Sequence, residues 1–213
     1  MSNNLPSGHS GTISSVLANI TSDANGRFNQ EMNSPTDIIG IIAKATQTDY
    51  AASIVPVAFP LSGTTYPLAF THHDIPVVKN ATLTAWSTLL DTDGGVPNHL
   101  PLGTTGGMIG SVLCIDSGNP VVGAEIVSQN ASSNAKIRYL NADGNGFNSD
   151  GITASGIYIA VNSGLAEKFD AYLDGKKINL TEVKAGSKAG YIFVVDLPIE
   201  CDEQGIEICT PGW

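Results

Sequence analysis

Apolar residues in this chain recur in short runs that alternate with small polar residues, and turn-forming residues separate the runs. This spacing is typical of β-strands, whereas an amphipathic helix shows apolar residues three and four positions apart. The runs that we expect to form strands are 12–20, 38–45, 53–59, 75–78, 81–89, 108–115, 121–127, 135–140, 156–161, 168–173, 177–183 and 191–197. Helical periodicity is poor everywhere, and only 163–169, preceded by Asn162 as a cap, predicts a turn or two of helix.

Proline and glycine positions refine these strand assignments. Pro56 lacks an amide hydrogen, so its strand is expected at a sheet edge or at a bulge. Asp174-Gly175 is the strongest short hairpin signal in the chain, because both residues tolerate the positive φ angles of a tight turn. Short strands at this spacing favour sandwiches over an α/β fold. We therefore predict an all-β protein of two Ig-like β-sandwich halves with little helix.

The expected organisation has four parts, and prolines and glycines between 97 and 107 mark the main boundary. They are a flexible polar N-terminal segment (1–11), a first β-sandwich-like domain (12–100), a second β-sandwich domain (108–199) and a C-terminal tail (200–213) that a disulfide would close.

Composition and charge narrow the class of protein. The 213 residues are 42% hydrophobic and 14% charged, which favours a folded chain over a disordered one. The formal net charge is −10, and Arg27 and Arg138 are the only arginines. A nucleic-acid-binding protein needs a basic face to replace counterions, so we expect no nucleic-acid partner. The sequence contains no run of 18 apolar residues, so we expect no membrane span.

The first residues bear on the compartment. Met1 to Asn4 show neither the basic nor the apolar region of a signal peptide. A cytosolic start would explain this, and so would a leader that this sequence lacks. The richness in Ser, Thr and Asn and the cysteine placement favour the second alternative, so we expect periplasmic or cell-surface localisation. The polar segment 2–11 resembles the tether of a bacterial lipoprotein, which makes a lipid anchor in the precursor an expectation.

The chain has three cysteines, Cys114, Cys201 and Cys209. The last two flank a segment that can turn back at Gly205, so we expect a disulfide between Cys201 and Cys209. Cys114 is then the unpaired cysteine, buried as a small hydrophobe. Three free thiols are the alternative. Metal ligation is disfavoured, because zinc sites usually show closer cysteine spacing and further ligands.

Two places in the chain carry the same turn sequence. Asp23-Ala24-Asn25-Gly26 and Asp143-Gly144-Asn145-Gly146 are each followed within two residues by Phe-Asn. In such a string Asp accepts hydrogen bonds from amides further on, and the final Gly takes the left-handed conformation. We expect each string to be a type I turn with a glycine bulge that joins two antiparallel strands.

Around the second turn a family resemblance appears. Residues 118–126 (GNPVVGAEI), 141–147 (NADGNGF) and 156–161 (GIYIAV) resemble the first strand, the hairpin and a later strand of carboxypeptidase regulatory-like domains. These domains are prealbumin-like β-sandwiches, and the resemblance spans roughly 108–197. It is weaker in the first half, where 21–28 fits the hairpin but the G-x-P opening is missing. The resemblance implies a binding, folding-support or surface-architecture role rather than catalysis, and specifies no ligand.

The same turn is a candidate calcium site. Asn141, Asp143 and Asn145 present oxygen ligands at alternating positions, with Asp150 beyond them, as the first half of a calcium loop does. The bidentate Glu expected at the twelfth position is absent, because residue 152 is Ile. A plain hairpin of turn-forming residues is the alternative. Calcium is the one cofactor that we consider.

Catalytic and transition-metal signals are weak. His72-His73-Asp74 has ligand types, but adjacent residues of a strand point to opposite faces. No H-E-x-x-H, phosphate-binding loop, dinucleotide fingerprint or nucleophile elbow occurs. We therefore expect no enzyme, although a hydrolase with carboxylates far apart in sequence stays an open alternative.

Aromatic residues offer a candidate ligand surface. Trp86 and Tyr66, with Tyr50, Phe70 and Trp213, could stack on sugars, whereas aromatics in sandwiches more often belong to the core. The expected function is a non-enzymatic, exported binding or interaction module with a protein or glycan partner at the cell surface. The alternatives are a carbohydrate-binding accessory module and a calcium-stiffened, adhesin-like spacer.

Overall fold

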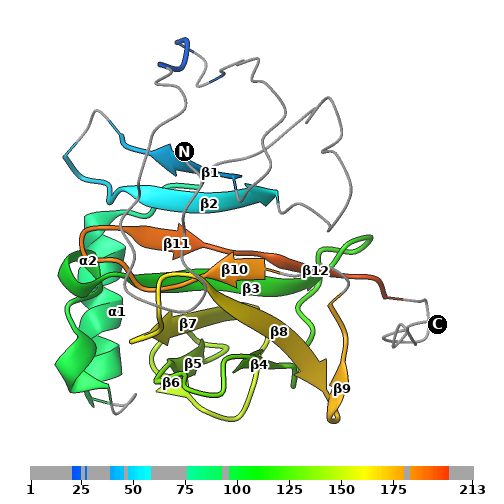
Figure 1. The fold of residues 1–213 in the computed structure, drawn as a ribbon. Coiled ribbons are helices and arrows are strands. Elements are labelled where there is room, and N and C mark those ends of the chain that lie inside the picture. The colour runs from blue at the N-terminus through cyan, green and yellow to red at the C-terminus, as the bar shows by residue number, and fades with distance from the viewer. Residues whose placement is uncertain are drawn as a thin grey trace.

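The computed structural model describes residues 21–24, 27, 39–45, 48–58, 76–92, 96–179 and 183–201. These residues form two β-sheets packed face to face, with a helical layer on the outer face of the larger sheet (Figure 1). The predicted all-β, sandwich-like fold class is confirmed.

The larger sheet is mixed and has the strand order β1-β2-β11-β3-β7-β5-β6, with β12 against β3. Its strands are β1 (Ile39–Ala43), β2 (Ser53–Ala58), β3 (Gly107–Cys114), β5 (Lys136–Leu140), β6 (Phe147–Asn148), β7 (Ile157–Val161), β11 (Ile192–Val194) and β12 (Leu197–Ile199). Strand β11 runs parallel to both of its neighbours, β2 and β3, and β12 runs parallel to β3. The other pairings in this sheet are antiparallel.

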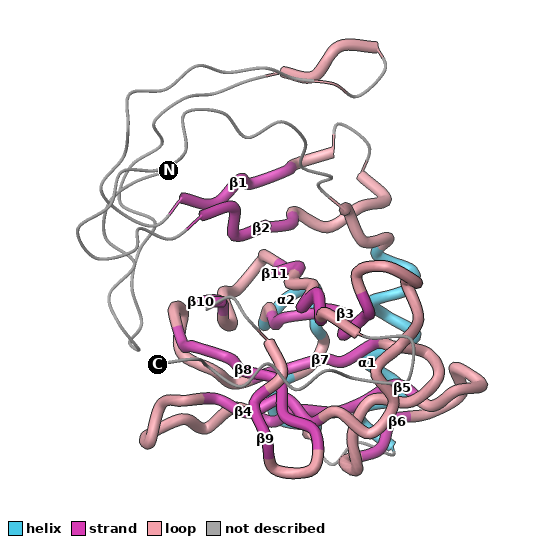
Figure 2. The backbone as a smooth tube through the Cα atoms, turned by 90° about the vertical axis from the view of Figure 1, so that its right-hand side faces the viewer, coloured by secondary structure: helices cyan, strands magenta, loops and turns pink. Residues whose placement is uncertain are grey.

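The smaller sheet has the order β10-β8-β4, and β9 pairs with β8. Its strands are β4 (Glu125–Ser128), β8 (Glu167–Leu173), β9 (Lys176–Lys177) and β10 (Val183–Ala185). Figure 2 shows this sheet and helix α1 on opposite sides of β3 and β7. The main core lies between the two sheets and includes Met108, Ile126, Tyr158, Phe169 and Phe193.

The helical layer consists of α1 (Asn80–Thr92), the 3-10 helix η1 (Pro97–His99) and the short α2 (Leu102–Thr105). Leu83, Leu90 and Leu102 form a second core with the opposite face of the large sheet. The central strands of that sheet are therefore buried on both faces. In β7, Tyr158 belongs to the core between the sheets and Ile159 to the core under the helices. Burial on both faces explains the unbroken apolar runs in the sequence.

The predicted strand over 81–89 is wrong, because this segment is the middle of helix α1. Its buried residues are Leu83, Ser87 and Leu90, whose spacing of four and three marks one face of a helix. Intervening threonines produced the apparent alternation. The Thr84 and Thr88 hydroxyls donate to carbonyls one turn earlier. Packing on the sheet thus outweighs the modest preference of threonine for strands.

The predicted helix over 163–169 is also wrong. Strand β8 begins at Glu167, and Asn162 adopts a φ of 59° instead of capping a helix. The segment between β7 and β8 is a loop, and Asn162 is bound there through its side chain, which donates to the Asn134 carbonyl.

The two hairpin turns predicted in the second half of the chain are present. Asp174 and Gly175 have φ angles of 49° and 75°, as a type I′ turn requires, and they join β8 to β9. The Asp143 turn joins β5 to β6 as expected, but the left-handed glycine is Gly144, with φ 73°. In the Asp23 turn, the Arg27 amide donates to Asp23 Oδ1, and the strands expected around it lie outside the described residues. Pro56 lies next to a register shift between β1 and β2, which confirms the predicted bulge.

The two expected domains share a sheet where the structure describes them. Strand β2 pairs with β11, so Ile54 enters the same core as Phe193 (Figure 1). Among the described residues, 12–100 contributes the β1–β2 hairpin, helix α1 and the 3-10 helix η1 to the fold of 108–199. A separate sandwich built with the remaining residues of 12–100 stays a prediction. Residues 1–11 and 202–213 lie outside the described part of the chain.

Gly110 in β3 offers a test of this packing. A Cβ atom there would lie 2.7 Å from the Tyr158 hydroxyl and would also overlap the Val195 carbonyl oxygen. We expect Gly110→Ala to lower the free energy of unfolding by about 3 kcal/mol or more in chemical denaturation. Gly103→Ala is the control, since its nearest atom would be Leu83 Cδ1 at 3.9 Å. A Gly110→Ala protein as stable as the control would contradict the packing.

Candidate functional site

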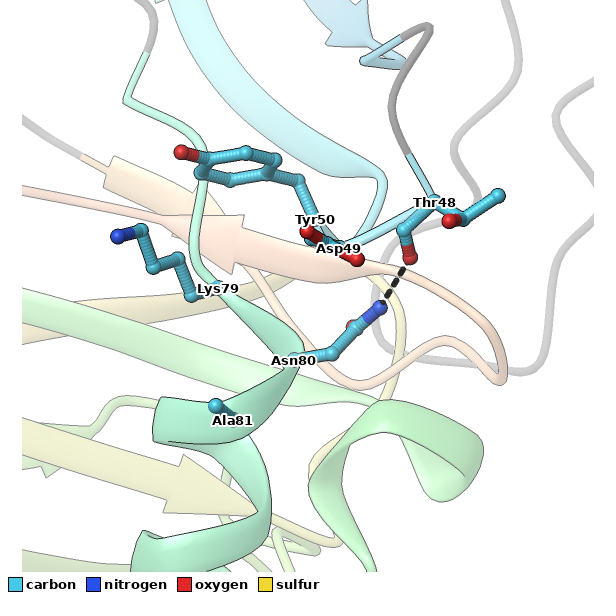
Figure 3. A pocket seen from close by; sticks show the side chains of 6 residues that line it. All are labelled: Thr48, Asp49, Tyr50, Lys79, Asn80 and Ala81. Carbon is cyan, nitrogen blue, oxygen red and sulfur yellow. Dashed lines mark hydrogen bonds between the residues drawn. The ribbon is translucent and has the colours of Figure 1, made fainter.

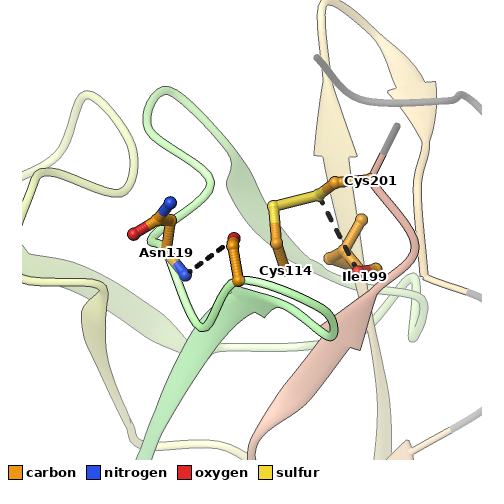
Figure 4. The surroundings of a disulfide bond; sticks show 5 residues. Cys114, Asn119, Ile199 and Cys201 are labelled. Atoms are coloured by element: carbon orange, nitrogen blue, oxygen red, sulfur yellow. Dashed lines mark hydrogen bonds between the residues drawn. A yellow bond between two sulfur atoms is a disulfide. The ribbon is translucent and has the colours of Figure 1, made fainter. Parts of the chain in front are cut away.

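A disulfide joins Cys114, at the end of β3, to Cys201, just beyond β12 (Figure 4). The sulfur atoms are 2.08 Å apart, the Cα atoms 5.5 Å apart, and 87 positions separate the two residues in sequence. The expected Cys201–Cys209 bond is therefore wrong, and so is the expectation that Cys114 is unpaired. Cys209 itself lies outside the described residues.

The parallel pairing of β12 with β3 decides this connectivity. Ile199 is the register partner of Cys114, and the Ile115 amide donates to the Ile199 carbonyl at 2.9 Å. This pairing carries Cys201, two residues further on, to the end of β3. Cys114 is held from the other side, where its amide donates to the Asn119 carbonyl at 2.9 Å. Sequence spacing favoured the nearer cysteine, because no local signal reports a parallel strand pair between segments so far apart.

A hollow of about 290 Å³ opens where the loop before β2 meets the start of helix α1. It is lined by Thr48, Asp49, Tyr50, Lys79, Asn80 and Ala81 (Figure 3). The backbones of Tyr50 and Lys79 form an antiparallel bridge, and their side chains extend to the same side. The hollow therefore combines an aromatic ring, an ammonium, a carboxylate and an amide within one small surface depression.

Asn80 holds the wall of this hollow. Its backbone amide donates to the Asp49 carbonyl at 2.7 Å, and its side-chain nitrogen donates to the Thr48 carbonyl at 2.8 Å. Both bonds tie the loop to the first turn of α1. The sequence analysis placed Tyr50 among the candidate aromatics, but nothing in the sequence brings residues 48–50 to residues 79–81.

Two buried tyrosines serve the scaffold. The Tyr139 hydroxyl in β5 accepts a hydrogen bond from the Ile126 amide in β4 at 2.7 Å, which ties the two sheets together. Burial raises the pKa of Tyr139 to about 12. The Tyr158 hydroxyl donates to the Val195 carbonyl at 2.8 Å, and burial raises its pKa well above the ordinary value, with a smaller contribution from Asp196. Neither hydroxyl is exposed to a ligand.

Glu167, at the start of β8, is a carboxylate only 3% exposed. It accepts hydrogen bonds from the Ser128 and Ser133 hydroxyls at 2.7 and 2.5 Å, and from the Gly164 amide at 2.5 Å. These donors come from β4, the β4–β5 loop and the β7–β8 loop. Glu167 therefore fixes two connections at one end of the sandwich and is already occupied by structural donors.

Asp170, in the middle of β8, is the second buried carboxylate, 7% exposed. It accepts hydrogen bonds from Lys177 Nζ at 2.9 Å and from Asn179 Nδ2 at 3.1 Å. Asn179 is 4% exposed, and its carbonyl oxygen accepts the Ala171 amide at 2.7 Å. The sequence analysis missed this cluster, because Lys177 and Asn179 reach Asp170 only through the pairing of β9 and its extension with β8.

The predicted calcium ligands lie around the β5–β6 hairpin and are engaged in local hydrogen bonds. Asn141 Oδ1 accepts from Asn148 Nδ2 at 2.9 Å, and Asp143 Oδ1 accepts from the Asn145 amide at 3.0 Å. Asp150 Oδ1 accepts from the adjacent Ser149 hydroxyl at 3.2 Å. The part of the chain that the structure describes holds no group of three or more His, Cys, Asp or Glu placed to hold a metal ion. Calcium binding stays a prediction, and residues 72–74 lie outside the described part.

Trp86 belongs to the packing of α1. Its ring meets Phe147 edge-on, with centroids 6.3 Å apart and an interplanar angle of 89°. Trp86 is therefore better described as packed against the core than as part of a ligand surface. Tyr66 lies outside the described residues. The outer face of the small sheet carries one aromatic residue in the described strands, Tyr172, rather than a row.

Comparisons of the chain with protein families, with curated proteins and with solved structures found no match. No helix in the described residues has the length and apolar character needed to cross a membrane.

The Tyr139 bond between the sheets can be tested by Tyr139→Phe. The change leaves the buried Ile126 amide without its acceptor, so we expect a loss of about 1–3 kcal/mol in the free energy of unfolding. Tyr172→Phe is the control, because this half-exposed hydroxyl only receives a long bond of 3.4 Å from Gln129. We expect the control to change stability by less than about 0.5 kcal/mol.

The same variant has a signature in alkaline solution. A pKa raised from 10.0 to about 12 means that the Tyr139 contribution is complete below pH 10 and is lost as the pH rises towards 12. The expected loss is about 2–3 kcal/mol. In Tyr139→Phe the decline between these pH values should be smaller by that amount, although Tyr158 still contributes. An unchanged decline would contradict the assignment.

Proposed function

We propose that this protein is a non-enzymatic, extracytoplasmic β-sandwich module that binds a protein or a glycan. The observation that carries the proposal is the Cys114–Cys201 disulfide. Disulfides persist in oxidising compartments such as the periplasm and the cell surface, and they are rare in reducing cytosol. This bond closes a long loop at the end of the sandwich, so it is part of the scaffold.

The buried polar groups support a role without catalysis. Glu167 and Asp170 are the buried carboxylates in the described residues, and donors from the scaffold already occupy both. The hydroxyls of Tyr139 and Tyr158 hold backbone groups. A catalytic acid or base has to face a substrate, whereas these groups face neighbouring strands and loops. The resemblance of 108–197 to carboxypeptidase regulatory-like domains also favours binding or surface architecture.

The disulfide argument is testable by removing the bond. A loop of 87 residues gives an expected loss of about 4–5 kcal/mol in the free energy of unfolding for Cys114→Ala/Cys201→Ala. Cys209→Ala is the matched control and should unfold like the parent protein. Alkylation of the denatured, unreduced parent protein should modify one cysteine of three. Three modified cysteines, or a double variant as stable as the parent, would remove the basis of the proposed compartment.

A second candidate function is carbohydrate binding at the hollow beside helix α1. The hollow presents the half-buried ring of Tyr50 next to Lys79, Asp49 and Asn80. A sugar offers one apolar face and a rim of hydroxyls, which an aromatic ring and adjacent polar groups can match. The hollow is small, about 290 Å³, so any such binding is expected to be weak.

A glycan array tests this candidate directly. We expect binding of at least one glycan class to fall about tenfold or more in Tyr50→Ala, because the stacking surface is lost. Tyr172→Ala is the control, since it removes a half-exposed tyrosine from strand β8 of the small sheet and should leave binding unchanged. An array without hits, or equal loss in both variants, would rule out the hollow as a glycan site.

A further inference from the structure

The extension of strand β9 along β8 brings Lys177 and Asn179 to Asp170. They are two positions apart in an extended segment, so their side chains leave the same face. Lys177 is the register partner of Tyr172, and the Ile178 amide donates to the Ala171 carbonyl at 2.9 Å. Asn179 therefore lies opposite Asp170, and Lys177 lies diagonally from it.

A single oxygen joins the two nitrogens. Asp170 Oδ1 is 2.9 Å from Lys177 Nζ and 3.1 Å from Asn179 Nδ2. The other end of the Asn179 amide is fixed as well, because its Oδ1 accepts the Ala171 amide at 2.7 Å. Asp170 and Asn179 are more than nine-tenths buried, whereas the Lys177 side chain is 41% exposed.

We propose that Lys177 and Asn179 react to form an intramolecular amide bond, with Asp170 as the proton carrier. The cluster holds each part that aminolysis of a carboxamide requires. Lys177 is the nucleophile, Asn179 Cγ is the electrophile, and the Ala171 amide is a donor placed on the oxygen that becomes negative. This modification is independent of the binding role proposed above.

The reaction balances within the cluster and needs no oxidant. Asp170 takes a proton from the Lys177 ammonium, and the freed lone pair of Nζ attacks Asn179 Cγ. The oxyanion at Asn179 Oδ1 is held by the Ala171 amide. Asp170 then passes the proton to Asn179 Nδ2, the Cγ–Nδ2 bond breaks and ammonia leaves. The remaining extra proton on Nζ goes to the ammonia, so ammonium is released and Asp170 is regenerated.

The proximity of Lys177 and Asn179 supplies most of the expected increase in reaction rate. Groups held against each other react as if at very high local concentration, while an unrestrained lysine and asparagine do not react measurably. The partial exposure of Lys177 gives ammonia a way out to solvent. Because water can also reach the side chain, we expect slow formation during storage rather than immediate completion.

The product has a distinctive chemical signature. Loss of ammonia lowers the mass by about 17 Da, and the acylated Lys177 is no longer a site for trypsin. The cross-linked protein should therefore yield a tryptic peptide of residues 177–184 that is about 17 Da light and shows no fragmentation between 177 and 179. Unreacted protein is cut after Lys177.

Mass spectrometry of the purified full chain, fresh and after prolonged incubation at physiological temperature, tests the proposal. We expect the light 177–184 peptide to accumulate in the parent protein and in Lys176→Arg, because Lys176 pairs with Leu173 and its side chain leaves the opposite face of β9 from Lys177. We expect none in Lys177→Arg, which keeps the positive charge but lacks the primary amine, and at least a tenfold smaller amount in Asp170→Asn.

Three results would overturn the proposal. One is the complete absence of the light peptide in the parent protein after incubation. Another is the same mass loss in Lys177→Arg. The third is a mass loss on a peptide that trypsin has cut after Lys177, because that pattern means a cyclic imide at Asn179 instead of a cross-link. Lys177→Arg keeps an exposed cation on β9, so its folding can be checked against the parent by thermal denaturation.

Discussion

Burial of the large sheet on both faces is the constraint from which the rest of the structure follows. Strands β3, β7 and β11 send alternate residues into two different cores, one under the small sheet and one under helix α1. Each of these strands therefore needs apolar residues at nearly every position, and each needs a cover on both sides. The helix and the small sheet are those covers.

Because these strands are buried on both faces, a polar group without a hydrogen-bond partner would lower the stability of the fold. Nearly all buried polar side chains in the described residues have such a partner. Tyr139 and Tyr158 bond backbone groups across the core, and Glu167 collects three donors from the loops. The Ser53 hydroxyl is the exception in the described residues, fully buried in β2 and without a hydrogen-bond partner. A buried hydroxyl in that state costs about 1–3 kcal/mol, so Ser53 marks a weak point of the sheet.

The disulfide and the proposed cross-link lie at the edges of this double-layered body. Cys114–Cys201 holds the parallel strand β12 against β3, where the chain leaves the sheet. The Lys177–Asp170–Asn179 cluster lies on the outer face of the small sheet, at its β9 side. The disulfide joins two strands that are far apart in sequence, whereas the proposed cross-link joins two residues of one strand extension beside β8.

The sequence alone determined the strand-rich class, most strand positions between 107 and 173 and the Asp174-Gly175 and Asp143 turns, because these depend on local alternation and on local backbone conformation. The run 177–183, expected as one strand, is divided between β9, which ends at Lys177, and β10, which begins at Val183, and residues 76–78 lie outside the strands. Tertiary structure alone decided that 80–92 is a helix, that Cys114 pairs with Cys201, and that Tyr50 meets Lys79. Each of these depends on surfaces that meet only after folding. The threonine-rich segment 80–92 has a strand-like sequence pattern, but it forms a helix because it packs on the large sheet. Local spacing favours Cys201–Cys209, but the parallel pairing of β12 with β3 brings Cys201 to Cys114.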